Sequence, residues 1–177
     1  MKKISLACLI LIALTTTSGC GYALAGKGSF LPDYIQVVGV PSFINKTTAF
    51  EIERVLTDRV RSEFGSRGKY RVQPDTNNVD AILTGTIVNL RFNNTAYTAG
   101  SQAQRVQLIV TASFEFKDVR ENKVLWTNPS MVFREDYDPT SALGTDPAAF
   151  LGGNANALER LAQNFARSLV TTILEAF

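Results

Sequence analysis

The sequence of 177 residues contains no histidine and only two cysteines. Histidine is the commonest general base and the commonest metal ligand in proteins, so its absence excludes every catalytic triad that contains one. Any catalysis would have to use carboxylates, tyrosine, lysine or serine. We therefore expect a protein that is not an enzyme and that needs no cofactor or metal.

A large excess of one charge is also lacking, because 18 basic residues face 16 acidic ones. Two of the basic residues, Lys2 and Lys3, lie in a segment with the features of a targeting signal, and without them each sign has 16 residues. No run of lysine or arginine with interleaved aromatic residues occurs. Proteins that bind nucleic acid normally carry a basic patch that neutralises phosphates. The sequence therefore disfavours that class of function.

The N-terminus has the three-part layout of a secretory signal: Met1–Lys3 is positive, Ile4–Leu14 is apolar, and Thr15–Gly19 is small and polar. The apolar run is too short to cross a bilayer, which takes about 20 residues. Two cleavage sites compete. Cleavage after Ala23-Leu24-Ala25 would start the mature chain at Gly26, but it leaves eleven residues between the apolar run and the cut.

The second cleavage site precedes Cys20, where Thr17-Ser18-Gly19-Cys20 resembles a bacterial lipobox. Thr17 stands where such sites usually have leucine. A disulfide is disfavoured, because Cys8 leaves with the signal and Cys20 then has no partner. A phosphate-binding loop at Gly21–Lys27 is disfavoured too, because Gly28 stands where Ser or Thr must hold magnesium. We therefore expect Cys20 to carry a lipid anchor.

Several acyl chains on Cys20 would give a stable anchor, because one buried chain alone is marginal. Gly21 follows the cysteine, where an aspartate would indicate retention at the inner membrane. The expected location is therefore the periplasmic face of the outer membrane.

The rest of the sequence predicts short strands, two helices and a meander of long strands. Strands are expected at Ile35–Val40, Tyr70–Gln73, Ala81–Phe92, Gln104–Asp118, Val124–Thr127 and Met131–Arg134. Asn128-Pro129 implies a bulge or an edge position, since proline cannot donate to the ladder. The Gln104–Asp118 strand alternates cleanly, which predicts a sheet that is packed on one face and wet on the other.

The first helix is expected after Thr47 or Thr48, with Glu51 completing a capping box. The second is expected after Asn154 or Asn156. The apolar stripe of the first is Ile52, Val55, Leu56, Val60 and Phe64. That of the second is Leu158, Leu161, Phe165, Leu169, Ile173 and Phe177.

These elements predict a two-layer α/β (α+β) fold, with two helices on one face of a mixed sheet of four to five strands. The first strand and helix form a crossover. The expected organisation is a signal peptide at residues 1–19, a lipidated tether at 20–33 and one domain at 34–177, with residues 138–153 as a loop.

Two groups of side chains could carry function. Glu135-Asp136-Tyr137-Asp138 clusters three carboxylates, although acidic residues at a strand end are usually just solvated. Four basic residues at strand ends and in a tight loop could meet anionic phosphates: Arg91, Lys117, Arg120 and Lys123.

Five stretches, in this order, resemble the LptE-type family of lipopolysaccharide-assembly lipoproteins. They are Cys20–Leu24 (CGYAL), Val40–Asn45 (VPSFIN) with Thr47, Leu56-Thr57, Asp80–Ile87 (DAILTGTI) and Phe165–Val170 (FARSLV). The resemblance covers nearly all of the mature chain, and its strength lies in the ordered set, since no single motif is specific.

This resemblance implies a lipid-anchored plug inside LptD, the large β-barrel that translocates lipopolysaccharide. Such a plug helps the barrel assemble and binds lipopolysaccharide during its delivery. The family supplies no contact residue for this chain, so the four basic residues are a separate hypothesis. The main alternative is a periplasmic lipoprotein that regulates cell-wall synthases or a secretion channel. A hydrolase that uses Asp136 or Asp138 is a third reading.

Overall fold

A computed structural model describes residues 31–67, 69–97, 103–137 and 155–176 of the chain. The expected signal peptide, most of the expected tether with Cys20, and the expected loop at 138–153 lie outside the described residues.

The first part of the domain is a parallel crossover. Strand β1 (Val37–Gly39) leads through helix α2 (Ile52–Ser66) to strand β3 (Arg71–Gln73). β1 and β3 pair in parallel, with Val38 opposite Val72. β1 also pairs in parallel with the start of β4. The predicted crossover is therefore confirmed.

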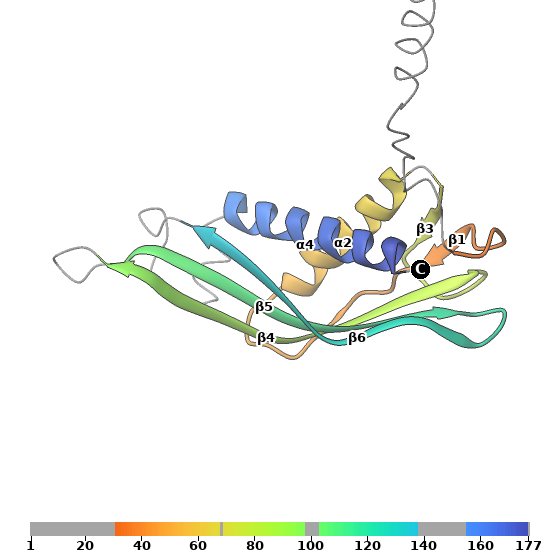
Figure 1. Ribbon diagram of the computed structural model, residues 1–177, viewed down its shortest axis with the longest axis horizontal. Coiled ribbons are helices and arrows are strands. Elements are labelled where there is room, and N and C mark those ends of the chain that lie inside the picture. The colour runs from red at the N-terminus through yellow and green to blue at the C-terminus, as the bar shows by residue number, and fades with distance from the viewer. Residues whose placement is uncertain (1–30, 68, 98–102, 138–154, 177) are drawn as a thin grey trace, which may run out of the picture.

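Three long antiparallel strands form the rest of the sheet, as the meander predicts. They are β4 (Ala81–Tyr97), β5 (Ala103–Asp118) and β6 (Lys123–Tyr137). Figure 1 shows them running almost the length of the domain, with the β5–β6 turn at the same end as β1 and β3. Pro129 and Ser130 stand opposite the single residue Ser113, so the predicted bulge is present in β6.

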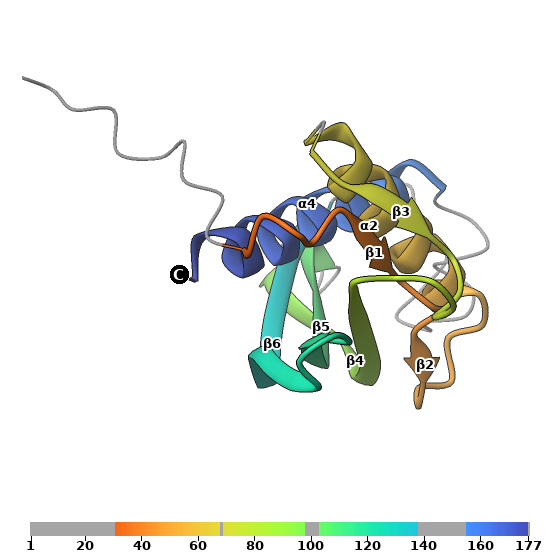
Figure 2. The ribbon, with the colours of Figure 1, turned by 90° about the vertical axis from the view of Figure 1, so that its right-hand side faces the viewer.

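Strand β2 (Ile44–Asn45) pairs with β4 and brings the mixed sheet to six strands, in the order β3-β1-β4-β5-β6 with β2 beside β4. The prediction of four to five strands missed β2, because two residues show no alternation. Helix α2 and helix α4 (Ala155–Glu175) cover one face of the sheet and leave the other open, as Figure 2 shows. The predicted two-layer α+β fold is confirmed.

The start of α2 differs from the prediction. Glu51 is the N-cap residue, has a left-handed backbone (φ 63°) and makes no side-chain capping bond, so the capping box is wrong. The Asn45 side chain organises the preceding loop instead. It donates to the carbonyl of Ala49 at 2.7 Å and to the Glu53 carboxylate at 2.8 Å, and it accepts from the N–H of Thr47 at 2.8 Å. The helix begins only after this loop closes.

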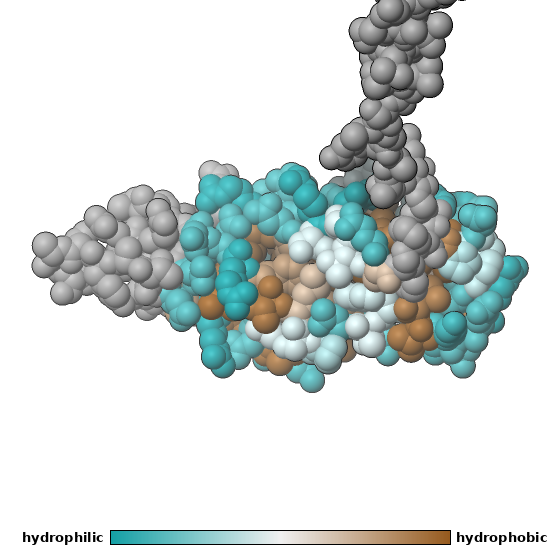
Figure 3. All heavy atoms as spheres, viewed as in Figure 1, coloured by the Kyte–Doolittle hydropathy of each residue, from teal (hydrophilic) through white to brown (hydrophobic). Residues whose placement is uncertain are grey.

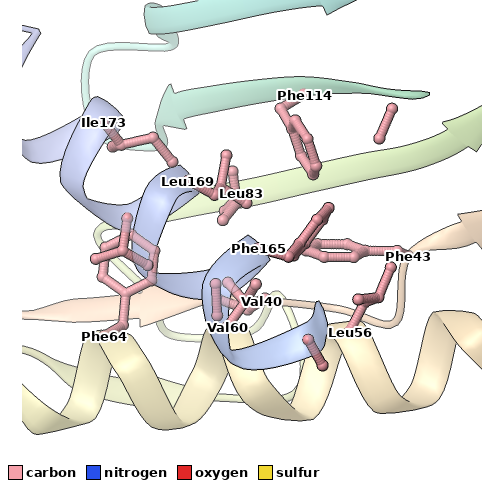
Figure 4. Close-up of a cluster of buried hydrophobic side chains, with 14 of the residues drawn as sticks. Val40, Phe43, Leu56, Val60, Phe64, Leu83, Phe114, Phe165, Leu169 and Ile173 are labelled. Atoms are coloured by element: carbon pink, nitrogen blue, oxygen red, sulfur yellow. The ribbon is translucent and has the colours of Figure 1, made fainter. Parts of the chain in front are cut away.

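The core lies between the helices and the covered face of the sheet, and its centre is aromatic. The Phe43 and Phe114 rings meet edge-to-face at 5.5 Å, and Phe165 of α4 lies 5.8 Å from Phe114 (Figure 4). Gly85 of β4 lies beneath two of these rings. A Cβ at this position would be 2.7 Å from Phe114 Cε1 and 2.8 Å from Phe43 Cδ1. The two rings therefore occupy the space that a side chain at residue 85 would need.

Replacing Gly85 by alanine is expected to lower the free energy of unfolding by about 1–3 kcal/mol, the usual cost of overpacking a core. Urea denaturation of the purified protein measures this change. Gly65 in α2 is a matched control, because a Cβ there meets no atom within 4 Å. Gly65→Ala should raise stability by roughly 0.5–1 kcal/mol. A Gly85→Ala variant as stable as the wild type would contradict this account of the core.

Candidate functional site

The open face of the sheet is polar along its centre. Residues of β4, β5 and β6 surround a shallow hollow of about 220 Å³. Its lining is mainly hydroxyl and carboxylate side chains, and the residues are Thr84, Gly85, Thr86, Ser113, Phe114, Glu115, Thr127 and Pro129. The alternating sequence of β5 predicts a polar face on this side of the sheet. The apolar residues of the alternation are buried beneath the helices, and they are Leu108, Val110, Ala112, Phe114 and Phe116. The face opposite the core is therefore built to meet water or a polar partner.

Three of the four predicted phosphate-binding residues come together at one end of the sheet. Lys123 pairs with Asp118 in the β5–β6 ladder, Lys117 pairs with Val124, and Arg120 lies in the turn between the two strands. Arg120 and Lys123 are exposed and Lys117 is half-buried. None of the three forms an ion pair with a carboxylate of the described residues. We call these three residues the tip cations.

Arg91 is far from the tip cations. It pairs with Ile109, eight residues before Lys117 along β5, so the two lie about 27 Å apart at the rise of an antiparallel strand. We expected Arg91 to lie near a strand end. It does not, because β4 continues to Tyr97. Its Nε donates to the side chain of Asn89 at 3.2 Å.

The structure adds a cation that sequence reasoning missed. Ile109 pairs with Arg91 on one side and with Arg134 of β6 on the other, which forms a row across three strands. All three side chains point to the open face, because their neighbours Leu90, Val110 and Phe133 point to the core. Strand spacing places the two arginines about 10 Å apart. The alternation of Met131–Arg134 could have shown from the sequence that Arg134 points to the open face. Only the pairing register shows that it lies in one row with Ile109 and Arg91.

The tip cations are joined to the first described residues by a hydrogen-bonded cluster. The Tyr34 hydroxyl donates to Oδ2 of Asp118, whose Oδ1 accepts from the N–H of Glu121 at 3.0 Å. The Arg120 guanidinium lies over the Tyr34 ring, 4.8 Å from its centre, in a cation–π contact. Asp118 has no exposed surface. This cluster holds the β5–β6 turn against the segment that precedes β1.

These contacts shift the pKa values of both partners. The hydrogen bond to Asp118 raises the pKa of Tyr34 to about 12, with smaller contributions from burial and from the Asp118 charge. Burial acts to raise the pKa of the Asp118 carboxyl. Hydrogen bonds from Tyr34 and from the backbone of Glu121 and Arg120, with the Arg120 charge, outweigh it and lower that pKa. The pair is therefore a neutral hydroxyl and a carboxylate at neutral pH.

The predicted carboxylate cluster does not form a site. Glu135 points to the helix layer, where it accepts from the Asn164 amide at 3.0 Å. Asp136 points to the open face and accepts from Gln107 at 2.8 Å. Successive residues of a strand face opposite sides of the sheet, which separates these two acids. Asp138 lies outside the described residues. The part of the chain that the structure describes has no cluster of three or more Cys, Asp or Glu side chains that could hold a metal ion.

The fold of this domain is shared with solved structures. It resembles the PelC dodecamer from Paraburkholderia phytofirmans, at 16% identity and a TM-score of 0.51, over 81% of this chain and 90% of that one. It also resembles the hypothetical protein CT253 from Chlamydia trachomatis, at 10% identity and a TM-score of 0.51, over 78% and 95% of the two chains. At such identities the likeness shows a shared two-layer fold alone.

The family model of LptE, described as lipopolysaccharide-assembly, matches residues 35–173. That range contains every described strand and nearly all of both helices. The chain therefore belongs to the lipopolysaccharide-assembly (LptE) family, as the resemblance implied. No curated protein matches the chain by sequence. Neither described helix is both long and apolar enough to span a membrane.

Replacing Tyr34 by phenylalanine tests the cluster through its pH dependence. A pKa raised from 10 to about 12 means that the contact stabilises the fold fully below pH 10 and that this stabilisation is lost as the pH rises to 12. The wild type should therefore lose more stability than Tyr34→Phe over this window. Urea midpoints of both proteins at several pH values measure the difference, and the other tyrosines cancel in it. Parallel curves would show that the hydroxyl makes no such contact.

Proposed function

We propose that the protein is an outer-membrane lipoprotein, anchored through Cys20, that plugs the lipopolysaccharide-translocating barrel LptD and assists its assembly. Family membership supports a role in lipopolysaccharide assembly. The anchor, the barrel and the non-catalytic role are inferences from the sequence and from this family. The chain offers no histidine and, in its described part, no carboxylate group arranged for metal chemistry.

The main structural support for the plug role is the open, polar face of the sheet. Helices cover only one face, so the other presents Thr84, Thr86, Ser113 and Glu115 to its surroundings. Hydroxyl and carboxylate side chains can exchange hydrogen bonds with water or with polar groups of a partner. A protein inside a water-filled barrel needs a surface of this kind. A partner with an apolar surface would bury these groups at a cost.

We further propose that the protein binds lipopolysaccharide through phosphates of lipid A or of the core. The four predicted residues, Arg91, Lys117, Arg120 and Lys123, remain the candidates, and Arg134 joins them. The row of Arg91, Ile109 and Arg134 is the better-formed subsite, because two exposed guanidinium groups flank an apolar side chain. Guanidinium groups bind phosphate oxygens in bidentate fashion. The tip cations form a second group.

A pull-down of the tagged full-length protein from outer membranes in mild detergent tests the plug role. We expect one large β-barrel to co-purify in stoichiometric amount. Recovery with cell-wall synthases or with a secretion channel would favour the regulator instead, and recovery alone would contradict the plug. A Cys20→Ala variant is examined in parallel and should lose metabolic labelling with a fatty acid, which tests the anchor separately from the barrel.

Reversing both charges of the arginine row should weaken lipopolysaccharide binding by at least about tenfold, since each charge-assisted bond contributes on the order of 1.5 kcal/mol or more. Displacement of a fluorescent lipopolysaccharide from the purified protein measures this for Arg91→Glu with Arg134→Glu. Arg71→Glu is the control, because Arg71 is an exposed cation on β3, away from the meander.

The tip is tested separately with Lys117→Glu and Lys123→Glu, which leave the Arg120–Tyr34 contact in place. If the reversed row binds as tightly as the wild type, the row is not a binding site. If neither pair of reversals weakens binding, direct recognition of lipopolysaccharide by these cations is wrong.

A further inference from the structure

Strand β6 has a long outer edge that no other described strand pairs with. It stands at the end of the sheet order and, among the described strands, pairs only with β5. The bulge at Pro129 interrupts its first half, but Met131–Tyr137 pairs with β5 in unbroken register. Every second residue of this segment directs its backbone N–H and C=O outward, and no described strand pairs with these groups.

A groove runs beside this edge. Its volume is about 210 Å³, and it is lined by Val132, Phe133, Arg134 and Glu135 of β6 and by Leu161, Asn164, Phe165 and Ser168 of α4. The four β6 residues are consecutive, so they belong alternately to both faces of the sheet. The groove must therefore lie along the outer edge of the strand, with one side of α4 as its other wall. Figure 2 shows α4 above β6, and Figure 3 views the domain from this side.

The floor of the groove is apolar and its rim is polar. The Phe133 and Phe165 rings are in tilted contact, with ring centres 4.2 Å apart and planes at 47°, and the two residues are 8% and 1% exposed. Ser168 and Asn164 are exposed residues of α4 at the rim. The groove is open beside the unpaired backbone, so a strand added there could also place a side chain over the two rings.

We propose that an extended segment of a partner protein binds here by adding an antiparallel strand to Met131–Tyr137. Peptides bind in this way in grooves between an edge strand and a helix, where main-chain hydrogen bonds supply affinity and side-chain pockets supply specificity. The antiparallel direction continues the pairing of β4, β5 and β6. The proposal does not depend on lipopolysaccharide binding, although Arg134 belongs both to this segment and to the arginine row.

Charge complementarity defines the peptide. Phe133 and Glu135 both face the helix side, two residues apart, and the described partner of the Glu135 carboxylate is the neutral Asn164 amide. An antiparallel strand should therefore carry a basic residue opposite Glu135 and, two residues later, an apolar residue opposite Phe133. Cross-strand pairs of opposite charge and of apolar side chains are each favourable.

A second copy of this chain is a poorer occupant. Antiparallel pairing of two Met131–Tyr137 segments over their full length centres on Arg134 and sets the two Arg134 side chains opposite each other. Like charges in directly opposed positions destabilise a sheet. The edge therefore disfavours its own copy and accepts a segment of different sequence.

The test uses the ¹⁵N-labelled full-length protein in detergent and a synthetic heptapeptide, acetyl-Thr-Thr-Lys-Thr-Val-Thr-Val-amide. Its lysine and its first valine are placed opposite Glu135 and Phe133. We expect saturable binding, with amide shifts and slowed hydrogen exchange at Met131–Tyr137. The control peptide is methylated on the alternate backbone nitrogens that face β6, and it should not bind. Absence of binding by the first peptide, shifts elsewhere, or equal binding by the methylated one would overturn the proposal.

Variants of the protein locate the peptide. Ser168→Trp fills the groove and should weaken binding by about tenfold or more, which corresponds to roughly 1.4 kcal/mol. Arg167→Trp, at the exposed neighbouring residue outside the groove lining, is the matched control and should bind normally. Glu135→Lys should reject the lysine peptide and accept one with glutamate in its place. Failure of this exchange, with normal circular dichroism, would refute the assigned pairing.

Discussion

The contact on which both layers depend is the meeting of Phe43, Phe114 and Phe165 above Gly85. These rings come from the β1–β2 connection, strand β5 and the last helix, so one aromatic cluster joins segments from the whole length of the domain. Aromatic rings in edge-to-face contact contribute beyond the area that they bury. Because this packing uses one face of the sheet completely, the other face has no helix to cover it and carries hydroxyl and charged side chains instead.

Much of this architecture could be predicted from the sequence. The clean alternation of Gln104–Asp118 indicated which side of the meander is buried, and Asn128-Pro129 indicated the bulge, since both signals are local. The predicted capping box was wrong and the predicted sheet of four to five strands missed β2, both for physical reasons. The Asn45 side chain forms four hydrogen bonds with Thr47, Ala49 and Glu53, and the loop that these bonds organise takes the place of the expected cap. The two residues of β2 owe their conformation to β4 rather than to their own pattern.

The candidate site was predictable only as a set of residue types. Charge and position in the chain selected Arg91, Lys117, Arg120 and Lys123, but they could not show that Arg91 stands apart. That separation follows from the pairing register, which also sets Arg134 beside Ile109. The acidic run Glu135-Asp136 shows the reverse effect. Neighbours in sequence became separated in space, because the strand turns each residue to the opposite side of the sheet.

The bonds around Tyr34 and Asp80 also determine how the domain would bear a mechanical load. The Asp80 carboxylate accepts from the backbone of Gln36 and Val37 at 2.9 and 2.8 Å, while Tyr34 is held by Asp118, 84 residues away. Tension applied at the N-terminal end is therefore shared between the start of β4 and the end of β5. β4 and β5 form the longest ladder of the sheet, so the pull acts on that ladder and not on the three residues of β1 alone.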